Sequence, residues 1–577
     1  MAKLWWAYPG LAVWRAVCRR TLRRYRRRLR HGPATNAATL RRILSAAAET
    51  TTGRQFGFAE ILAAPDPEQA FRERLPLRDY ASHAESIQAI ARGDADVLFA
   101  GRPGMFVATS GTSNDPKLLP TTALQQNSAL EHIALLAPAL RWEVAPQLRL
   151  NQRSINLMLA SDPANAMPGG VPLGMSSAGG LRKVLRAAPF IWTSPAAVFE
   201  LREHAMALYL HALFGLRDRD AGCIEAIFGT HILSWMNMVM SRRDELVADL
   251  REGRISADLP LPPAVRATLE AQLSPEPERA AEVAAAFAAG EAGLLQRLWP
   301  ELRVLSTVVS GAFAVSLPRL RWLAGPDIKI CASSFGATES MVGVNMWPDQ
   351  PDRYALAVGS GYFEFLPVQA VHAVQPQALA IDAVVVGECY ELVVTTFAGL
   401  YRYRLGDIVR VSDEIAGTPV FEFDHRLGDV LDLVGEKTTE KHTQQVVAEL
   451  ARQGLGAASA ISNYTVVADC TAAGLRYRVF IELAAADAGH AAGPELAVLF
   501  DELLQVVNPS YRTLARANGR LAQADVQLVA PGSFAALEDR RYQQAAGVSR
   551  NQVKVPRVLK DVAQIELLEA AVLRSTA

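Results

Sequence analysis

Apolar residues recur at helical spacing over much of the first 300 positions of the chain. Residues 35–100 show this pattern between short turns, and residues 195–255 and 262–298 show it with charged residues in between. Recurrence at every third or fourth position is typical of amphipathic helices. The same pattern predicts a long helix over Thr121–Leu140 that begins with a threonine cap. An apolar run at Ile155–Ala160 predicts a buried strand.

Beyond residue 300 the pattern changes to short apolar runs. These runs predict strands at Leu302–Val309, Ile328–Ala332, Glu388–Thr396 and Arg404–Val411. Helices that alternate with strands predict an α/β fold with mixed sheets and antiparallel pieces toward the end. The pattern restarts near Asp424–Asp429, so we expect a large N-terminal domain over residues 35–425 and a small α+β domain over residues 426–577.

Residues 1–34 form a separate basic and aromatic segment. It contains no acidic residue, and nine arginines stand between Arg15 and Arg30. One interpretation is a helix that packs on the domain, with its arginines in solvent or paired with acids. The other is contact of residues 1–31 with an anionic membrane or an acidic partner. The segment does not match a signal peptide, because Pro9 and Gly10 break its apolar stretch and the charge follows that stretch.

The composition excludes several classes of function. The chain has 577 residues, and Lys plus Arg equals Asp plus Glu at 59 each, which argues against general nucleic-acid binding. The five cysteines are scattered and show no zinc-binding spacing, so the cytoplasm is the simplest compartment. No apolar run reaches membrane-spanning length.

The stretch Thr109–Pro120 holds the first candidate for chemistry. Its small residues include Ser110, Gly111, Thr112 and Ser113. Such residues can turn backbone N–H groups and hydroxyls toward one anion, and Lys117 adds a point charge that suits phosphate. The chain has no Gly-Lys dipeptide, which excludes a Walker-type phosphate loop. An ordinary polar loop is the alternative, since Ser, Thr and Gly are common turn residues.

A second motif, Phe335–Glu339, follows an apolar strand and suits a nucleotide. The ring of Phe335 can stack on a base, and the glycine after it allows close backbone approach. The hydroxyl of Thr338 can reach a phosphate, and the carboxylate of Glu339 can hold Mg²⁺. The alternative is a strand-to-helix turn in which Thr338 or Glu339 is a capping group.

A third motif, Gly399–Asp407, ends in a Gly-Asp pair after a predicted strand. The ionised carboxylate of Asp407 can accept hydrogen bonds from two ribose hydroxyls. The alternative is a hairpin turn with basic strand residues in solvent.

The fourth motif, Asn551–Arg557, lies near the C-terminus and contains Lys554. The chain has only eight lysines, so a lysine within a motif is informative. Its ammonium could neutralise the charge that develops between a carboxylate and an α-phosphate. The alternative is an exposed lysine of the tail.

With these four motifs in this order, the chain resembles the acyl acid–amido synthetases of the auxin-responsive promoter (Gretchen Hagen) family, within the acyl-adenylate-forming superfamily. The resemblance extends over residues 75–560, and Tyr390–Val411 is its most specific match. The other matching stretches are Met167–Pro172, Trp192–Pro195, Val309–Phe313 and Gly435–Glu440. The resemblance implies that the large domain carries out adenylation and that the small domain swings during the cycle.

The resemblance also implies roles for individual residues. Arg426 and Lys437 match basic positions that contact the phosphate or ribose of the nucleotide, and Gly311 lies in a nucleotide-binding stretch. The implied catalytic residues are Lys117, Glu339 and Lys554.

Three positions depart from the family pattern. Asn114 stands near the place of a usual glycine, and it tolerates left-handed backbone. Phe335 replaces a tyrosine, which keeps the stacking ring and loses its hydroxyl, and Ala337 replaces a serine.

The implied reaction has two steps, with ATP as a substrate and Mg²⁺ as the metal. A carboxylic acid and ATP give an acyl-adenylate and pyrophosphate, and an amine, expected to be that of an amino acid, then takes the acyl group and releases AMP. This route needs no nucleophilic side chain, in agreement with the absence of a Gly-x-Ser-x-Gly motif.

Two alternatives stay open at this point. One is a ligase that uses the same first step and a thiol acceptor such as coenzyme A. The other is a non-catalytic protein that binds a nucleotide or an acyl ligand. The intact charged set of Lys117, Glu339, Asp407 and Lys554 argues against the second.

Overall fold

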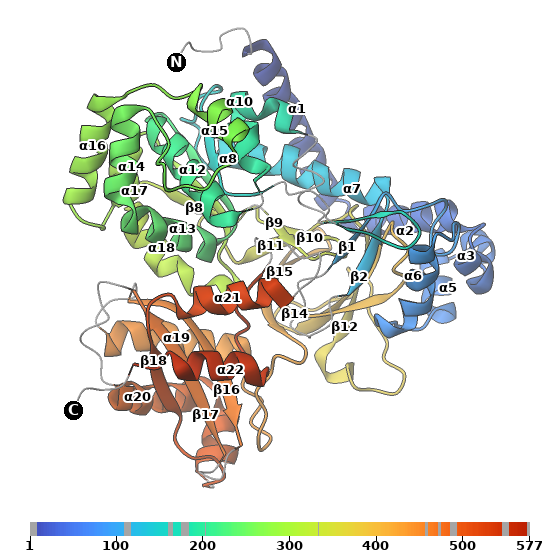
Figure 1. The fold of residues 1–577 in the computed structure, drawn as a ribbon. Helices are drawn as coiled ribbons and strands as arrows, with labels where there is room; N and C mark the ends of the chain where they lie inside the picture. Colours follow the sequence, from blue (N-terminus) through green and yellow to red (C-terminus); the bar gives the residue numbers. More distant parts are fainter. Residues whose placement is uncertain are drawn as a thin grey trace.

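The computed structural model describes residues 8–108, 117–159, 165–174, 184–201, 203–332, 334–455, 460–470, 475–484, 493–517, 519–544 and 553–573. Within these ranges the chain is an α/β protein with four sheets. A large N-terminal part holds three of the sheets, and a smaller C-terminal part, orange to red in Figure 1, holds the fourth. The predicted fold class is therefore confirmed.

A layer of helices precedes the first strand. They are α1 (Tyr8–Leu29), α2 (Gly32–Ala47), α3 (Thr51–Phe56), α4 (Phe58–Ala63), α5 (Pro67–Arg74) and α6 (Ala81–Arg92). Side-chain oxygens of Thr50 and Asp66 cap α3 and α5. Asn36 of α2 exchanges two 2.9 Å hydrogen bonds with the backbone of Phe363, which ties this layer to the largest sheet.

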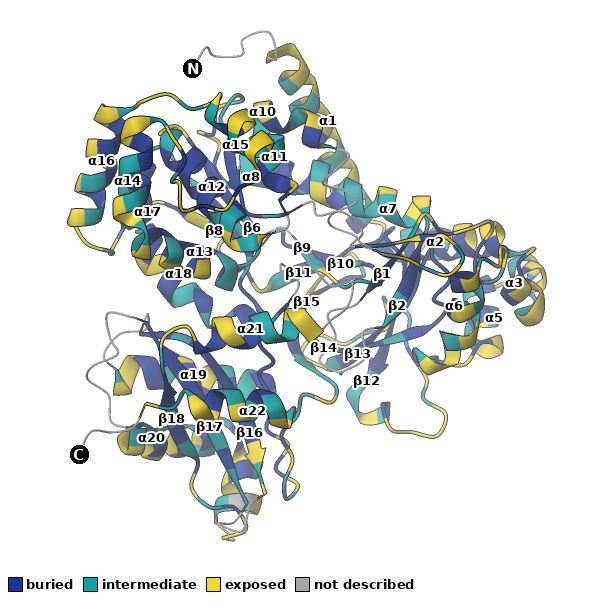
Figure 2. Cartoon of the chain, in the orientation of Figure 1, coloured by how far each residue is buried: buried dark blue, intermediate teal, exposed yellow. Residues whose placement is uncertain are grey.

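The largest sheet is antiparallel and has the order β12-β13-β14-β15-β11-β10-β9. Its strands are β9 (Ser334–Gly336), β10 (Met341–Val344), β11 (Arg353–Leu356), β12 (Tyr362–Pro367), β13 (Cys389–Thr395), β14 (Tyr403–Ile415) and β15 (Thr418–Arg426), and the turn η5 (Val368–Ala370) follows β12. Side chains on both faces of β12 and β13 are buried along nearly the whole of these strands (Figure 2).

A second sheet is parallel, with the order β3-β6-β7-β8. Its strands are β3 (Ser154–Asn156), β6 (Cys223–Phe228), β7 (Val304–Val308) and β8 (Lys329–Cys331). The helices and turns around it are η3 (Leu185–Ala187), α10 (Ala188–Ile191), α11 (Ala196–Phe199), α12 (His204–Arg217), α13 (Gly229–Ser241), α14 (Arg243–Glu252), α15 (Pro263–Glu270), α16 (Pro277–Ala288), α17 (Leu294–Leu298), η4 (Gly311–Phe313) and α18 (Ser316–Ala324).

A third, small sheet has the order β2-β1-β5-β4. Its strands are β1 (Met105–Ala108), β2 (Leu118–Thr121), β4 (Asn165–Ala166) and β5 (Pro172–Gly174). The helical run after β2 consists of α7 (Ala123–Leu130), the π-helix η2 (Glu131–Leu136) and α8 (Ala137–Val144). The predicted helix from Thr121 is thus confirmed, with Thr122 as its cap, and it continues four residues past the predicted end.

One prediction is wrong in this part of the chain. Residues 195–255 were expected to be helical throughout, but β6 lies in the middle of them. All residues of β6 except Glu225 are apolar, so its pattern does not alternate and matches that of a buried helix. The four predicted strands beyond residue 300 are all present, as β7, β8, β13 and β14.

The C-terminal part has its own sheet, with the order β16-β17-β18. Its elements are α19 (Glu440–Gly454), β16 (Ile461–Asp469), β17 (Arg476–Leu483), α20 (Gly493–Val507), η6 (Tyr511–Arg516), β18 (Asp525–Val529), α21 (Ser533–Gln544) and α22 (Val562–Ala570). Buried residues from Leu431 onward form a core of their own. The segment that carries Lys554 runs along β16, where Val466 bonds to the backbone of Arg557 and Leu559 at 2.9 Å each.

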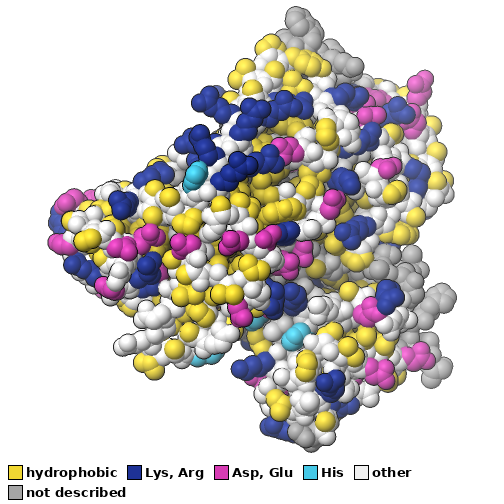
Figure 3. Space-filling model, turned by 180° about the vertical axis from the view of Figure 1, so that it is seen from behind, with side chains coloured by type: hydrophobic (Ala, Val, Ile, Leu, Met, Phe, Trp, Pro, Cys, Tyr) yellow, Lys and Arg dark blue, Asp and Glu magenta, His cyan; other side chains and the backbone are white. Residues whose placement is uncertain are grey.

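Helix α1 packs one of its faces on the N-terminal part. Cys18, Leu22, Tyr25 and Leu29 are buried, and Trp14 Nε1 donates to Ala134 O at 3.2 Å. The interpretation of this segment as a packed helix is therefore confirmed. Arginines gather on the other face, in a basic patch that Figure 3 shows from behind. None of the helices in the described ranges is both long and apolar enough to cross a membrane.

Candidate active site

The site is built around Asp407 and Arg426 on two neighbouring strands. The residues face each other across β14 and β15, and Arg426 Nε lies 3.7 Å from Asp407 Oδ1. Gly406, at φ 76°, takes the left-handed conformation that places Asp407 after it. The nearby Asp407 carboxylate is the main cause that raises the pKa of Arg426, so the guanidinium stays charged.

Glu339 lies next to this pair, at the turn between β9 and β10. Its side chain is buried, and burial raises the pKa of its carboxyl, while the nearby Arg426 and Lys117 favour the ionised form. Burial and, after it, the charge of Glu339 raise the pKa of Tyr403, so these two side chains lie close together, and Lys117 Nζ donates to the Tyr403 oxygen at 3.2 Å. Lys117, Tyr403 and Glu339 therefore form one polar group beside Arg426.

Lys554 brings the C-terminal part into the same cluster. Burial lowers the pKa of its ammonium, and the charge of Arg426 lowers it further. The carboxylates of Glu440, Asp407 and Asp429 oppose this shift, so they too lie close to Lys554. The structure thus brings together the predicted residues Lys117, Glu339, Asp407, Arg426 and Lys554, which come from distant places in the sequence.

Hydrogen bonds of Arg557 connect the segment that carries Lys554 to the loop around Gly311. Its side chain is buried, and its Nε donates to Ala312 O at 2.8 Å and its Nη1 to Asn463 Oδ1 at 2.7 Å. Gly311 has φ 55°, and a Cβ there would lie 3.0 Å from the ring of Phe423. The predicted nucleotide loop at Gly311 is therefore held from both parts of the molecule.

Phe335 belongs to an aromatic cluster beside this loop. Its ring centroid lies 5.5 Å from that of Tyr354 and 5.8 Å from that of Phe423, and Ser310 Oγ bonds to the Tyr354 hydroxyl at 2.8 Å. The ring is half-buried within these neighbours. Stacking of Phe335 on a base stays a prediction.

Other predicted residues are placed differently or lie outside the described ranges. Ser110, Gly111, Thr112, Ser113 and Asn114 are outside the described residues. Lys437 is exposed at φ 46°, and within the described ranges no hydrogen bond or ion pair joins its side chain to the cluster. Its contact with a nucleotide stays a prediction.

A cavity of about 340 Å³ opens next to the cluster. Thr338 and Gly336 line one wall, Gln125 of α7 lines another, and the ends of β6 and β7 close it. The amide of Gln125 donates to the backbone oxygen of Glu339, so the helix is tied to the site. The volume lies in the range of small-molecule sites.

Several residues of this cluster were not predicted from the sequence. Tyr403 lies inside the third motif, and its signal was the aromatic residue between two arginines before the Gly-Asp pair. Glu440 also lies in a matching stretch, but Asp429 carried no signal beyond its place near the predicted boundary. Among the described residues no group of three or more His, Cys, Asp or Glu could hold a metal by itself.

Comparison with known proteins shows the family of this chain. Models of the GH3 family match the chain with the N-terminal domain at residues 21–329, the central domain at 354–426 and the C-terminal domain at 441–563. The indole-3-acetic acid-amido synthetase GH3.8 of Oryza sativa subsp. indica is 29% identical over 527 residues, which cover 88% of this chain and 85% of that protein. The indole-3-acetic acid-amido synthetase GH3.5 of Arabidopsis thaliana is 29% identical over 548 residues, with 88% and 86% covered.

Solved structures show the same fold. An acyl acid amido synthetase, AtGH3.15 in complex with 2,4-DB, superimposes with a TM-score of 0.83 at 23% identity, over 97% of this chain and 96% of that chain. A 2-hydroxyisobutyryl-CoA ligase in the postadenylation state, with 2-HIB-AMP, superimposes with a TM-score of 0.53 at 13% identity, over 93% and 90%. At these identities the likeness concerns the fold.

Proposed function

This chain belongs to the GH3 family, and on that premise we propose that it adenylates a carboxylic acid with ATP and transfers the acyl group to the amine of an amino acid. It is a ligase that forms carbon–nitrogen bonds through an acyl-adenylate. The observation that supports the residue roles below is the convergence of Lys117, Glu339, Asp407, Arg426 and Lys554 on one place between the two parts of the molecule.

The first half-reaction requires cations at the reacting phosphate. A carboxylate oxygen attacks the α-phosphorus of ATP, the bond from that phosphorus to the bridging oxygen breaks, and pyrophosphate leaves. Two anions approach each other in this step, so fixed positive charge stabilises the transition state. Arg426 and Lys554 are two cations of the cluster that lie close enough for the charge of Arg426 to lower the pKa of Lys554. We assign them to the α-phosphate and the attacking carboxylate.

Asp407 has the acceptor atoms for the ribose. Its contact with Arg426 is long at 3.7 Å, so its carboxylate oxygens keep capacity for hydroxyl donors. Gly311 and the aromatic cluster around Phe335 lie close by, where an adenine ring would follow the ribose.

The carboxylate of Glu339 is suited to bind a magnesium ion that also contacts the phosphates of ATP. Mg²⁺ is usually held by one or two carboxylates together with substrate phosphates and water, so a single protein carboxylate suffices. When bound there, the ion would neutralise phosphate charge. Lys117 and Tyr403, which are hydrogen-bonded to each other at 3.2 Å, lie beside the Glu339 carboxylate.

The second half-reaction needs room at the acyl carbon. The amine nitrogen attacks that carbon, the bond to the AMP oxygen breaks, and the nitrogen loses its proton. Lys554 occupies the cluster in the described arrangement, so it must withdraw before the amine can enter. We propose that residues 426–577 rotate as a small domain for this purpose, about a hinge beside Arg426.

ATP–pyrophosphate exchange tests the first step and product analysis tests the second. The protein is incubated with Mg²⁺, labelled pyrophosphate and a panel of carboxylic acids, and exchange should depend on both ATP and acid. Products made with a mixture of amino acids are then identified by mass spectrometry. Amides confirm the proposal, whereas a thioester with coenzyme A and no amide would contradict it.

Residues 1–31 add a proposal about location. Exposed arginines on α1, together with Val13 and Val17, would let this face of the helix rest on an anionic membrane. Replacing Arg19, Arg20, Arg23 and Arg24 with glutamine should abolish sedimentation with phosphatidylserine vesicles at low salt. Sedimentation equal to that of the unmodified protein would contradict membrane contact.

A further inference from the structure

The guanidinium of Arg557 bridges the two parts of the molecule. The residue is buried, with 3% of its surface exposed. On the N-terminal side, Nε and Nη2 both donate to the carbonyl oxygen of Ala312 in η4, Nε at 2.8 Å. On the C-terminal side, Nη1 donates to Asn463 Oδ1 at 2.7 Å and to the carbonyl oxygen of Tyr464 in β16. One planar group therefore fixes the position of β16 relative to η4, and we call these contacts the Arg557 bridge.

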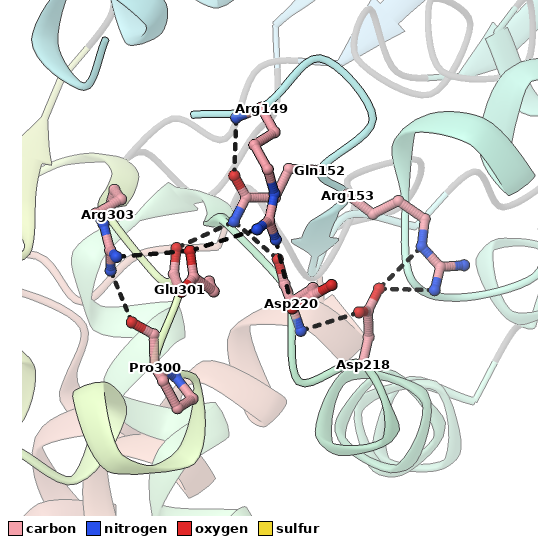
Figure 4. Close-up of polar contacts among 8 residues, drawn as sticks. All are labelled: Arg149, Gln152, Arg153, Asp218, Asp220, Pro300, Glu301 and Arg303. Atoms are coloured by element: carbon pink, nitrogen blue, oxygen red, sulfur yellow. Dashed lines mark hydrogen bonds and ion pairs between the residues drawn. The ribbon is translucent and has the colours of Figure 1, made fainter. Parts of the chain in front are cut away.

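Neutral oxygens, and no acid, hold the charge of Arg557. Other arginines pair with carboxylates of their own part, as Arg153 does with Asp218 in Figure 4, where Arg153 Nε and Asp218 Oδ2 lie 2.9 Å apart. Among the residues that the structure describes, no carboxylate forms an ion pair with Arg557. Its Cζ lies 4.5 Å from the centroid of the Tyr464 ring. Loss of the Ala312 oxygen would leave a buried cation with fewer acceptors, so the bridge favours the arrangement in which both parts contribute.

The bridge is connected to Lys554 by a short segment with a fixed backbone. Arg557 follows Lys554 by three residues. The carbonyl oxygen of Arg557 accepts the N–H of Val466 at 2.9 Å, and Pro556 O accepts the hydroxyl of Thr465 at 2.7 Å. These bonds hold the segment along β16. A shift of the guanidinium relative to η4 therefore moves the Lys554 ammonium with it.

An apolar contact lies on the other side of Lys554. Val553 is buried and packs against Ala108 and Leu118. These are the last residue of β1 and the first residue of β2, and the predicted phosphate motif stands between them in the sequence. Apolar contacts are not directional, so this one allows the segment to slide. The directional hydrogen bonds of Arg557 are the contact that sets the position of Lys554.

The turn η4 is held in place by the N-terminal part. The ring of Phe313 stacks on that of Phe228 with their centroids 3.8 Å apart. The hydroxyls of Ser310 and Tyr354 are hydrogen-bonded at 2.8 Å. The carbonyl oxygen of Ala312 is therefore a fixed point beside the predicted nucleotide loop.

We propose that Arg557 is a positioning residue for the first half-reaction: its bonds to Ala312 O hold Lys554 at the reacting phosphate, and they break when residues 426–577 rotate for the second. The proposal rests on the proposed function, and it names the contact that keeps that same site in the adenylating arrangement. Misplacing a catalytic group by about 1 Å costs about 100-fold in rate. Amide formation follows the release of the bridge, so its rate does not depend on Arg557.

The first experiment measures both half-reactions in Arg557→Lys. Lysine keeps a positive charge but lacks the planar fork that reaches η4 and β16 together. Adenylate formation, by rapid quench with ATP and the acid that gives the fastest exchange, should slow by about 10–100-fold. Amide formation from the preformed adenylate of that acid and a mixture of amino acids should equal or exceed the parent rate. An equal loss in both half-reactions, or no loss in the first, would overturn the proposal.

The matched control is Arg516→Lys in the same part of the molecule. Arg516 pairs with Asp501 at 2.9 Å and donates to Leu521 O at 2.7 Å, so these contacts lie within the C-terminal part. Its replacement weakens this part and leaves the Arg557 bridge intact. The ratio of the two half-reactions should therefore stay at the parent value. A ratio that changes as much as in Arg557→Lys would show that stability alone explains the effect and would overturn the proposal.

A second variant tests the bridge from its C-terminal end, and it serves also if Arg557→Lys fails to fold. Asn463→Ala removes one acceptor of Nη1 and leaves the bonds to Ala312 O in place. The guanidinium then holds β16 less firmly, so adenylate formation should slow by about 3–10-fold with amide formation unchanged. Adenylate formation at the parent rate in Asn463→Ala would overturn the proposal. Absence of exchange with every acid in the parent protein would instead contradict the proposed function.

Discussion

Two arginines at the same end of the neighbouring strands β14 and β15 differ in how many hydrogen bonds and ion pairs the protein gives them. Arg402, immediately before β14, is buried and donates to both oxygens of Glu364 at 2.8 and 3.1 Å, and to the carbonyl oxygen of Arg72 at 2.8 Å. Arg426, at the end of β15, has a 3.3 Å bond to Leu405 O and a 3.7 Å contact with Asp407. Both arginines carry the same charge, and only the first is saturated by the protein.

The difference separates a structural charge from one that is available to a substrate. A buried ion pair with all its donors satisfied holds its surroundings in place, and it has nothing left to offer a ligand. The two longer contacts of Arg426 leave N–H donors of Arg426 and acceptor sites of Asp407 for a ligand. Arg402 therefore belongs to the framework of the sheet, and we assign Arg426 and Asp407 to the nucleotide.

The largest effect should come from breaking the saturated pair. Arg402→Met leaves the Glu364 carboxylate buried without its partner and should lower the free energy of unfolding by about 3–5 kcal/mol. Urea denaturation measures the loss. The double variant with Glu364→Leu should recover part of it, because no uncompensated charge is then left. A single variant as stable as the parent protein would show that the pair is dispensable.

Lys554→Ala should have the next largest effect, and on catalysis. Adenylate formation should slow by about 10²–10³-fold, the cost of losing one preorganised electrostatic group. Rapid-quench measurement of acyl-adenylate gives this rate. The same variant supplied with preformed acyl-adenylate should make amide at nearly the parent rate. An equal loss in both half-reactions would contradict a Lys554 that withdraws before the second step.

The pH dependence of the parent enzyme checks the same group. Burial and Arg426 lower the pKa of Lys554 below the ordinary value of 10.5, so its ammonium loses the proton at a lower pH than a free lysine. Adenylate formation should therefore fall as the pH rises through that lowered pKa. Lys554→Arg keeps its charge over this range and should remove the fall. A decline that persists in Lys554→Arg would point to another group.

Asp407→Asn should have a smaller effect, confined to the nucleotide. We expect ATP to bind more weakly by about 1–3 kcal/mol, the usual cost of losing charge-assisted hydrogen bonds. Calorimetry measures the affinity. The matched control is Asp413→Asn on the same strand, whose carboxylate is half-exposed and pairs with Arg353. If both variants bind ATP as the parent does, Asp407 does not contact the nucleotide.

The smallest effect should be that of Glu339→Gln on the metal requirement. Removing the charged oxygen should raise the Mg²⁺ concentration needed for half-maximal exchange by about tenfold, with a much smaller change for the acid. Titration of Mg²⁺ at fixed ATP gives both values. Identical Mg²⁺ curves would return Glu339 to a structural role in the turn before β10.

The course of the chain was readable where the local pattern has one interpretation. Three features were predicted correctly: the cap at Thr122, the strands β13 and β14, and the C-terminal unit. Each has a hydrophobic period or a stop signal that few other structures produce. β6 was missed because a strand buried on both faces loses its alternation. No strand was predicted for β9, β10, β11, β12 or β15 either.

The sequence by itself determined the family and the candidate residues for the chemistry, because residue type and order along the chain are local properties. Motifs of a few residues named Glu339, Asp407 and Lys554, together with the family. The sequence pattern does not determine that these residues lie close together in space. Lys554 and Asp407 are 147 positions apart, and only the packing of the C-terminal part against the largest sheet places their charges within mutual influence.

The tertiary structure alone also decided what surrounds those residues. Arg402 and Arg426 are the same residue type in the sequence. The number of hydrogen-bond acceptors around each side chain depends on which strands and loops pack against it. The cavity of about 630 Å³ beneath α1 is lined by residues scattered along the chain between Gly10 and Glu225, so no single segment encodes its volume. Contacts between distant segments depend on how side-chain shapes fit after folding, and a linear pattern of polar and apolar positions does not contain that information.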